Sequence, residues 1–138
     1  MDPTDRPETR TLEPGLEGHA TVVVTEDMLA QAVGSGTAAV YATPCLVALM
    51  ERAAVDCVER HLPATEASLG VHIDVHHTAP TLPGVTVSAR ATLTRIDGRK
   101  LLIAIEAWST TESIGTASHT RVIVDVARFR SKLTGKSL

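Results

Sequence analysis

The stretch "YATPCLVALMERAAVDCVER", residues 41–60, decides the fold, because its apolar side chains recur with the period of a helix. The centre of one face of this helix is entirely apolar: Leu46, Met50, Ala53 and Cys57. The opposite face is charged: Arg52, Asp56 and Glu59. A helix with one broad apolar face has to bury that face against another layer of structure.

Glu51 has an unusual position on this helix. On the helical wheel it falls at the border of the apolar face, between Val47 and Val58 on one side and Val55 on the other. A carboxylate at such a border is either a surface group whose stem covers apolar neighbours or a group held at the wall of a pocket. The residues alone leave both interpretations open.

The elements around this helix predict an α+β domain. Thr43 is expected to cap the helix, with Pro44 at its first position. One strand, residues 19–27, is expected before the helix. Four strand-like stretches follow it: residues 70–79, 85–96, 101–109 and 113–126. The turn "DGRK" joins two of them as a hairpin, and a short helix is expected at "ARFRSKL". One long helix and a run of antiparallel strands make two layers.

Composition limits the function. The chain has 138 residues and a net charge of −3, with one Phe, one Trp and one Tyr, so nucleic acid is not an expected partner. No apolar run is long enough for a membrane span, and "MDPTDRPETR" at the start has no apolar signal core. We therefore expect a cytoplasmic protein with two reduced cysteines, Cys45 and Cys57. Residues 1–17 contain three prolines and are expected to form a flexible arm before a single domain, residues 18–138.

The second informative stretch is "VHIDVHHTAP", residues 71–80. Because side chains on a strand alternate between faces, one inward row is expected: Val71, Ile73, Val75 and His77. This alternation distinguishes His77 from its neighbour His76, which should face solvent or another chain. Taken alone, His77 is more simply a core histidine bonded to a backbone carbonyl than a functional group.

Other polar residues carry weaker signals. His72, Asp74 and His76 share the outer face of that strand, but their spacing is awkward for a metal ion, and we predict no metal site. The stretch "SHTRVIVDV", residues 118–126, places Arg121 on one face with His119 and Ile123. Arg121 has the chemistry to bind a phosphate or a carboxylate, and a structural ion pair is at least as good an interpretation.

Several segments together resemble a known family. They are "AVGSGTAAVYATPCLVALMERAA", "SLGVHIDVHHTAPTLPG", "DGRKL" and "IGTASHTRVIVD", which occur in the same order within residues 14–130. In these segments the chain resembles the hotdog-fold thioesterases of the fluoroacetyl-CoA thioesterase-like family. The most specific parts of the resemblance are "ATP…ALME" and "HHTAP".

The resemblance implies a fold, an activity and a site. The fold is a hotdog, an antiparallel sheet wrapped around one long central helix, working as a homodimer with sites at the subunit interface. The activity is hydrolysis of an acyl-CoA thioester without a cofactor. The catalytic positions match Thr43, Glu51 and His77, and Gly70 matches a position near the reacting centre. The remaining expected substrate-binding residues are Ser35, Gly36, Tyr41 and Arg121.

One departure concerns the loop before the helix. The fluoroacetyl-specific enzyme has phenylalanines there that cover the pocket, whereas this loop reads "GSGTAAVYATP" and the only Phe of the chain is Phe129. Thr37 matches one of those positions, and Tyr41 is the nearest aromatic residue. We therefore expect a thioesterase for a small acyl group that is not specific for fluoroacetyl-CoA. The alternative is a hotdog module that binds an acyl group or small molecule without catalysis.

Overall fold

A computed structural model describes residues 5–136 and has the expected α+β architecture. Its strands are β1 (Glu17–Val23), β2 (Glu66–His77), β3 (Thr86–Asp97), β4 (Lys100–Ser109) and β5 (Ser113–Asp125). Its α-helices are α1 (Ala30–Val33), α2 (Thr43–Val58) and α3 (Val126–Thr134). Two short 3₁₀ turns, Glu26–Met28 and Glu59–His61, flank α1 and α2. The predicted long helix, the strands, the hairpin and the terminal helix are all present, with ends shifted by a few residues.

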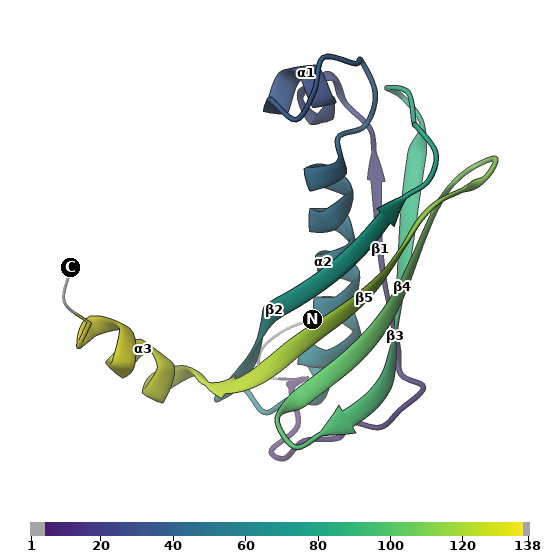
Figure 1. Ribbon diagram of the computed structural model, residues 1–138. Coiled ribbons are helices and arrows are strands. Elements are labelled where there is room, and N and C mark those ends of the chain that lie inside the picture. The colour runs from purple at the N-terminus through teal and green to yellow at the C-terminus, as the bar shows by residue number, and fades with distance from the viewer. Residues whose placement is uncertain (1–4, 137–138) are drawn as a thin grey trace.

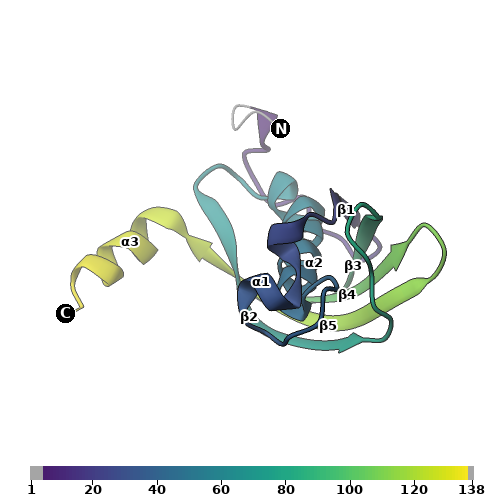
Figure 2. The same cartoon turned by 90° about the horizontal axis from the view of Figure 1, so that it is seen from above.

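The five strands form one antiparallel sheet in the order β1-β3-β4-β5-β2. The sheet curls around α2, which runs along its concave side (Figures 1 and 2). This is the arrangement expected for a hotdog fold. Because β2 is the last strand of the order, one of its edges has no neighbour among the described residues.

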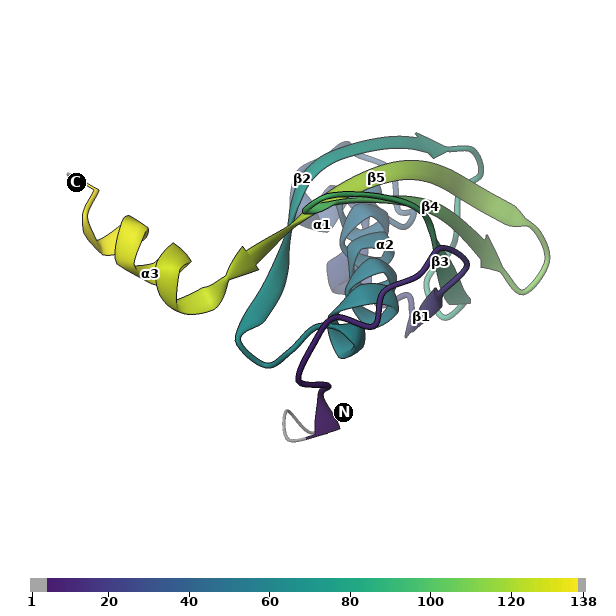
Figure 3. The same ribbon diagram turned by 90° about the horizontal axis from the view of Figure 1, so that it is seen from below.

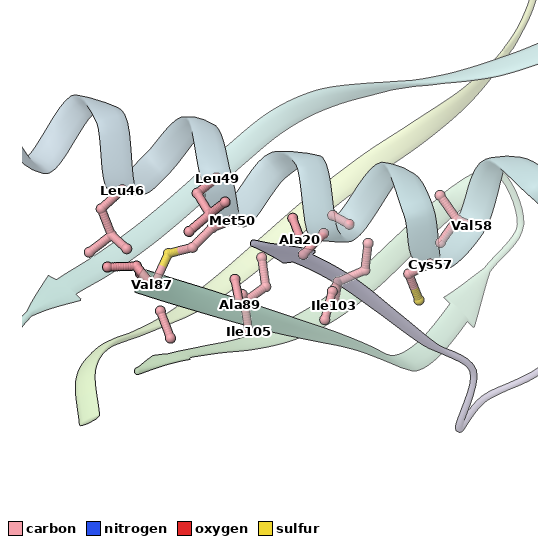
Figure 4. Close-up of a cluster of buried hydrophobic side chains, with 14 of the residues drawn as sticks. Ala20, Leu46, Leu49, Met50, Cys57, Val58, Val87, Ala89, Ile103 and Ile105 are labelled. Carbon is pink, nitrogen blue, oxygen red and sulfur yellow. The ribbon is translucent and has the colours of Figure 1, made fainter. Parts of the chain in front are cut away.

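The core lies between α2 and the concave face of the sheet. The four residues at the centre of the predicted apolar face are fully buried: Leu46, Met50, Ala53 and Cys57. They pack against side chains from β1, β3 and β4, among them Ala20, Ala89 and Ile105 (Figure 4). Burial of this apolar face is what holds the helix inside the sheet.

Strand β1 crosses α2 with very little space between the two backbones. Gly18 makes this possible, because a Cβ atom at this position would overlap the backbone nitrogen of Cys57 and the backbone oxygen of Ala53. The next residue adds a polar contact, since the backbone N–H of His19 donates to Asp56 on α2 at 2.8 Å. The glycine therefore decides how closely the first strand packs on the helix.

The cap expected at Thr43 is absent. The N-cap residue of α2 is Ala42, whose backbone is extended, and no side chain caps the helix there. Thr43 is the first helical residue, and its hydroxyl contacts His77 instead. The Thr43 hydroxyl therefore bonds to a residue that is distant in the sequence, and it does not cap the helix as local sequence rules predict.

The expected inward row on β2 is interrupted by a bulge. The register with β5 shifts between Gly70 and His72, so Val71 leaves the row and is 60% exposed. Beyond the bulge the alternation resumes, and Ile73, Val75 and His77 are half-buried as expected. The prediction for Val71 was wrong because one extra residue at a bulge changes the face of the side chain.

Both ends of the described chain leave the curled sheet. Near the N-terminus, Arg6 donates to the backbone oxygens of Leu62, Pro63 and Glu66, and Arg10 pairs with the Glu66 carboxylate at 2.7 Å. The division into an arm and a domain at residues 17 and 18 stays a prediction. At the other end, α3 points away from the sheet (Figures 1 and 3). In residues 5–136 no helix has the length and hydropathy needed to cross a bilayer.

Candidate active site

The first group of expected site residues lies where the start of α2 meets the end of β2. The Thr43 hydroxyl and His77 Nδ1 are 2.7 Å apart, a short hydrogen bond between a helix and a strand. Both residues line a pocket of about 260 Å³, together with Ser35 and Tyr41. The structure therefore brings together four of the expected site residues.

His77 has one ring nitrogen without a partner. Its Nε2 atom is buried and forms no hydrogen bond within the described chain. Burial lowers the pKa of His77, and a backbone contact with Ala79 acts in the opposite direction. The imidazole is therefore neutral at pH 7, with a nitrogen available to a group that enters the pocket.

Two other expected pocket residues have different roles from one another. Tyr41 is buried, its hydroxyl donates to the backbone oxygen of Cys45, and burial raises its pKa to about 12. Its ring therefore forms an apolar wall, and its hydroxyl is already used. Gly36 lies in an exposed loop after α1 with φ of 152°, a value that favours glycine, and it is not placed beside Thr43 or His77 by any contact.

The second group surrounds Arg121 on β5, whose side chain is almost fully buried. Its Nη1 atom lies 3.4 Å from Glu51 Oε2 on α2, and its Nε atom donates to Ser68 Oγ on β2 at 2.8 Å. Its Nη2 atom donates to the backbone oxygen of Ser68 at 3.0 Å and lies 4.0 Å from Glu59 Oε2. The guanidinium thus ties the helix to two strands, and it holds the Glu51 carboxylate at the helix border.

Glu59 was expected on the polar face of the helix, and this expectation was wrong. It follows the last residue of α2, is half-buried, and accepts a hydrogen bond from Ser68 Oγ at 2.8 Å. Burial lowers the pKa of Arg121, while the carboxylates of Glu59 and Glu51 raise it. An arginine with two carboxylate neighbours remains protonated at neutral pH.

His119 completes the surroundings of Arg121 and has a fixed tautomer. Its Nδ1 atom lies 2.7 Å from the backbone oxygen of His72, which can only accept, so Nδ1 carries the proton. Its Nε2 atom therefore accepts from Arg121 Nη1, at 3.1 Å. Burial lowers the pKa of His119, partly opposed by the hydrogen bond to His72, and the ring stays neutral beside the guanidinium.

The position that a side chain of residue 70 would take is occupied by atoms of three other residues. A Cβ atom there would lie 2.6 Å from Glu51 Oε2, 3.1 Å from His119 Cε1 and 3.2 Å from Arg121 Nη1. The absence of a side chain leaves the Glu51 carboxylate accessible from β2. On the other side, Glu51 and Arg121 line an open pocket of about 540 Å³ beside α2.

The two groups are separate within one chain. Thr43 and Glu51 are eight residues apart on α2, roughly 12 Å along the helix axis. His77 and Gly70 lie toward opposite ends of β2. A single chain therefore presents a Thr–His pair at one place and a Glu–Arg group at another. Among residues 5–136, no three His, Cys, Asp or Glu side chains are arranged to hold a metal ion.

The sequence pattern missed three members of the second group: Ser68, His119 and Glu59. One signal was available, because His119 and Arg121 alternate with Ile123 on a face that is otherwise apolar, and all three are buried. Two polar side chains in an apolar row require partners of their own. Those partners lie on β2 and at the end of α2, and no local sequence pattern links these elements to β5.

The comparisons with known proteins agree with this fold. The family model described as "FlK: Fluoroacetyl-CoA-specific thioesterase" matches residues 24–127. A fluoroacetyl-CoA thioesterase from Streptantibioticus cattleyicolor is 38% identical over 98 residues, which cover 71% of this chain and 70% of the relative.

Solved structures give the same result. A structure of the fluoroacetyl-CoA thioesterase FlK is 30% identical, with a TM-score of 0.84, over 92% of this chain and 98% of that one. A hypothetical protein of the thioesterase superfamily from Thermus thermophilus is 26% identical, with a TM-score of 0.85, over 91% and 93% of the two chains. The resemblance noted in the sequence and the prediction of a thioester hydrolase are confirmed at the level of the family. The chain belongs to the fluoroacetyl-CoA-specific thioesterase (FlK) family of hotdog-fold proteins.

Proposed function

We propose that this protein hydrolyses the thioester of a small acyl-CoA at a site formed by two copies of the chain. In this site Glu51, Arg121 and Gly70 of one copy face the Thr43–His77 pair of the other. The observation that carries the proposal is the division of the expected catalytic residues into two groups that one chain does not bring together. The free Nε2 atom of His77 and the accessible carboxylate of Glu51 are the two groups left to act on a substrate.

The free edge of β2 supports pairing between two copies. Leu69 and Val71 lie on this strand and are 36% and 60% exposed, although both are apolar. If two copies of β2 pair in antiparallel fashion about a twofold axis, the His77 end of one strand approaches the Gly70 half of the other. Such pairing places the two incomplete groups next to each other twice, once on each side of the axis.

The chemistry follows from the protonation states. Arg121 Nη1 lies 3.4 Å from the Glu51 carboxylate and holds it in place, and Glu51 acts either as the nucleophile on the thioester carbonyl or as the base for an attacking water. When Glu51 is the nucleophile, the carbonyl–sulfur bond breaks to leave an acyl anhydride on Glu51, which water then hydrolyses; when Glu51 is the base, it takes a proton from the water that attacks the carbonyl, and the same bond breaks. Neutral His77 accepts a proton from water and passes it to the departing thiolate. The Thr43 hydroxyl orients the imidazole. Addition of one water to the thioester gives the free acid and CoA by either route.

Fluoroacetyl specificity is not part of the proposal. In residues 34–41 the chain has no Phe, and the segment is almost entirely exposed apart from Tyr41. The pocket beside Thr43 thus lacks the aromatic cover that the resemblance associates with fluoroacetyl selection. We propose a small acyl group without this restriction. A cytoplasmic location stays a prediction from the sequence.

The first experiment measures release of free thiol from a panel of acyl-CoAs that includes acetyl, fluoroacetyl, medium-chain and aryl-acetyl thioesters. We expect turnover that Glu51→Gln abolishes, with fluoroacetyl-CoA not preferred over acetyl-CoA. Glu112→Gln is the matched control, because Glu112 is an exposed glutamate that lines neither the Thr43 pocket nor the Glu51 pocket. Near-normal turnover by the Glu51→Gln variant would exclude both roles of Glu51. Binding of acyl-CoA without turnover would favour a non-catalytic binding module.

A second experiment tests the shared site by mixing two inactive variants. When Glu51→Gln and His77→Ala chains are unfolded and refolded together, each mixed dimer contains one site with both native residues. We expect about a quarter of the wild-type activity, because half of the dimers are mixed and each of these has one intact site. If the site lay within one chain, every combination would remain inactive. Size-exclusion chromatography with light scattering reports the dimer independently.

A further inference from the structure

The buried Arg121 is not available to bind the phosphates of a CoA thioester. Its guanidinium is bonded to Ser68 and His119 and pairs with Glu51, so a phosphate would have to displace buried partners. Other arginines are also paired with carboxylates: Arg10 with Glu66, Arg60 with Asp56 and Arg90 with Glu106. Arg52 lines the Glu51 pocket, but the carboxylates of Glu51 and Asp56 line it too. These five arginines are therefore poorly placed to bind the phosphates of a CoA substrate.

Three cations converge on a separate pocket at the base of α3. Arg99 from the β3–β4 hairpin and Arg128 and Lys132 from α3 line a pocket of about 270 Å³. None of the three forms an ion pair with a carboxylate within the described residues, and Asp125 is the only acidic residue of the lining. The Asp125 carboxylate is partly occupied, because it accepts from the backbone N–H of Arg128 as the cap of α3. The pocket therefore carries an uncompensated positive charge.

The same pocket holds the chain's only phenylalanine, Phe129, which is half-buried against the end of β5. An aromatic ring next to guanidinium and ammonium groups matches a ligand that joins a heteroaromatic base to phosphates. Bases stack on aromatic rings, and Arg binds phosphate oxygens through two parallel hydrogen bonds. We propose that this pocket binds the phosphorylated adenosine end of CoA. This inference rests on the proposed acyl-CoA substrate.

The distance between the two sites suits such a ligand. Ile123 and Asp125 line the pocket and lie two and four residues beyond Arg121 on β5, roughly 7 and 14 Å along the strand. The pantetheine arm of CoA is about as long as a four-residue extended peptide, roughly 14 Å. A thioester near Glu51 and phosphates near α3 are therefore within the reach of one CoA molecule.

The projection of α3 from the sheet has a role in this proposal. The helix contributes Arg128 and Lys132 to the pocket, and none of its residues is buried. Figure 3 shows it pointing away from the curled sheet. A helix of nine residues with little buried surface gains order when an anionic ligand bridges it to the β3–β4 hairpin. Bound CoA is thus expected to protect the amides of α3 from hydrogen exchange.

The test measures the affinity of the full chain for free CoA, dephospho-CoA and pantetheine by calorimetry. Arg128→Gln and Lys132→Gln are each expected to weaken CoA about tenfold and to lower the ratio of CoA affinity to pantetheine affinity. The Arg130→Gln variant is the matched control, because it removes the same charge from the same helix outside the pocket. Its CoA affinity and turnover should equal those of the wild type.

The outcomes separate this site from the proposed activity. If the Arg130→Gln change weakens CoA as much as the Arg128→Gln change, or if neither changes the affinity, the pocket is not the CoA site. Acyl-CoA turnover that depends on Glu51 would still support the proposed function in that case. CoA binding that depends on Arg128 and Lys132 without turnover of any thioester would support the pocket and contradict the hydrolase.

Discussion

At the scale of single residues, the contact between Thr43 and His77 changes the expected role of a helix-start residue. The Thr43 hydroxyl forms a hydrogen bond of 2.7 Å with the His77 ring and does not cap α2. A helix cap and a positioning residue fail differently when the hydroxyl is removed. Loss of a cap costs about 1 kcal/mol of stability, whereas loss of a positioning contact lowers the reaction rate.

We therefore predict that Thr43→Val lowers kcat at least about tenfold while the free energy of unfolding changes by less than about 1 kcal/mol. Thr43→Ser keeps the hydroxyl and should retain most of the activity. Steady-state kinetics and urea unfolding of the three proteins provide the measurements. A stability loss in Thr43→Val without a change in kcat would return the residue to a structural role.

Gly70 makes a second residue-scale prediction possible, because a methyl group there would lie 2.6 Å from Glu51 Oε2. Gly70→Ala should displace the Glu51 carboxylate and lower kcat/KM by about a hundredfold, with the fold retained. Gly135→Ala is the control, since its added Cβ meets neighbours only at 3.6 Å or more. Steady-state kinetics of both variants measure this effect. Unchanged turnover in Gly70→Ala would mean that the reaction does not depend on the exact position of the Glu51 carboxylate.

At the scale of elements, the approach of β1 to α2 depends on the absence of a side chain at Gly18. The backbone atoms of Ala53 and Cys57 occupy the place of a Cβ, and backbone cannot rotate away as a side chain can. The strand would have to move from the helix and open the core around Ala20. This contact is a property of two elements together and of neither one alone.

Gly18→Ala is accordingly predicted to destabilise the protein by about 3 kcal/mol, which is the upper range for overpacking a tight contact. The Ala20→Ser variant does not serve as a control because it places a hydroxyl in the core. A better control is Gly135→Ala at the end of α3, which should leave the unfolding midpoint in urea unchanged. Equal stability of Gly18→Ala and the wild type would show that β1 can move without cost.

At the scale of the whole molecule, three histidines link stability to pH. Burial lowers the pKa of His61, His77 and His119 in the folded protein. In the unfolded chain the same groups take up protons near pH 6.5. The unfolded state therefore binds more protons between about pH 6.5 and the lower folded-state pKa values, and stability is lost as the pH falls through this window.

We predict that the urea concentration at the unfolding midpoint decreases as the pH is lowered from about 7.5 to about 5.5. The His119→Asn variant should show a smaller decrease. Asparagine can keep the hydrogen bond to the backbone oxygen of His72 but does not titrate. The wild type, measured over the same pH range, is the reference. A stability that rises as the pH falls through this range would contradict the sign of the argument.

The sequence by itself determined the elements and the family. The apolar row of α2, the alternation on β5 and the hairpin turn are local patterns, and local patterns depend on residues close in sequence. The same reading placed Glu51 at the border of the helix and His77 on the inner face of β2, where the structure has them. The segments "ATP…ALME" and "HHTAP" then indicated a family that the comparisons confirmed.

Only the tertiary structure decided which of these residues meet. The strand order, the bulge at Val71 and the pairing of Arg121 with Ser68 and Glu59 join positions that lie far apart in the sequence. A buried charge must find partners wherever the fold supplies them, and no periodicity encodes which partners those are. The separation of Thr43 from Glu51 is local, because eight residues of α2 span roughly 12 Å, whereas the contact of His77 with Thr43 comes from the long-range packing of β2 against α2.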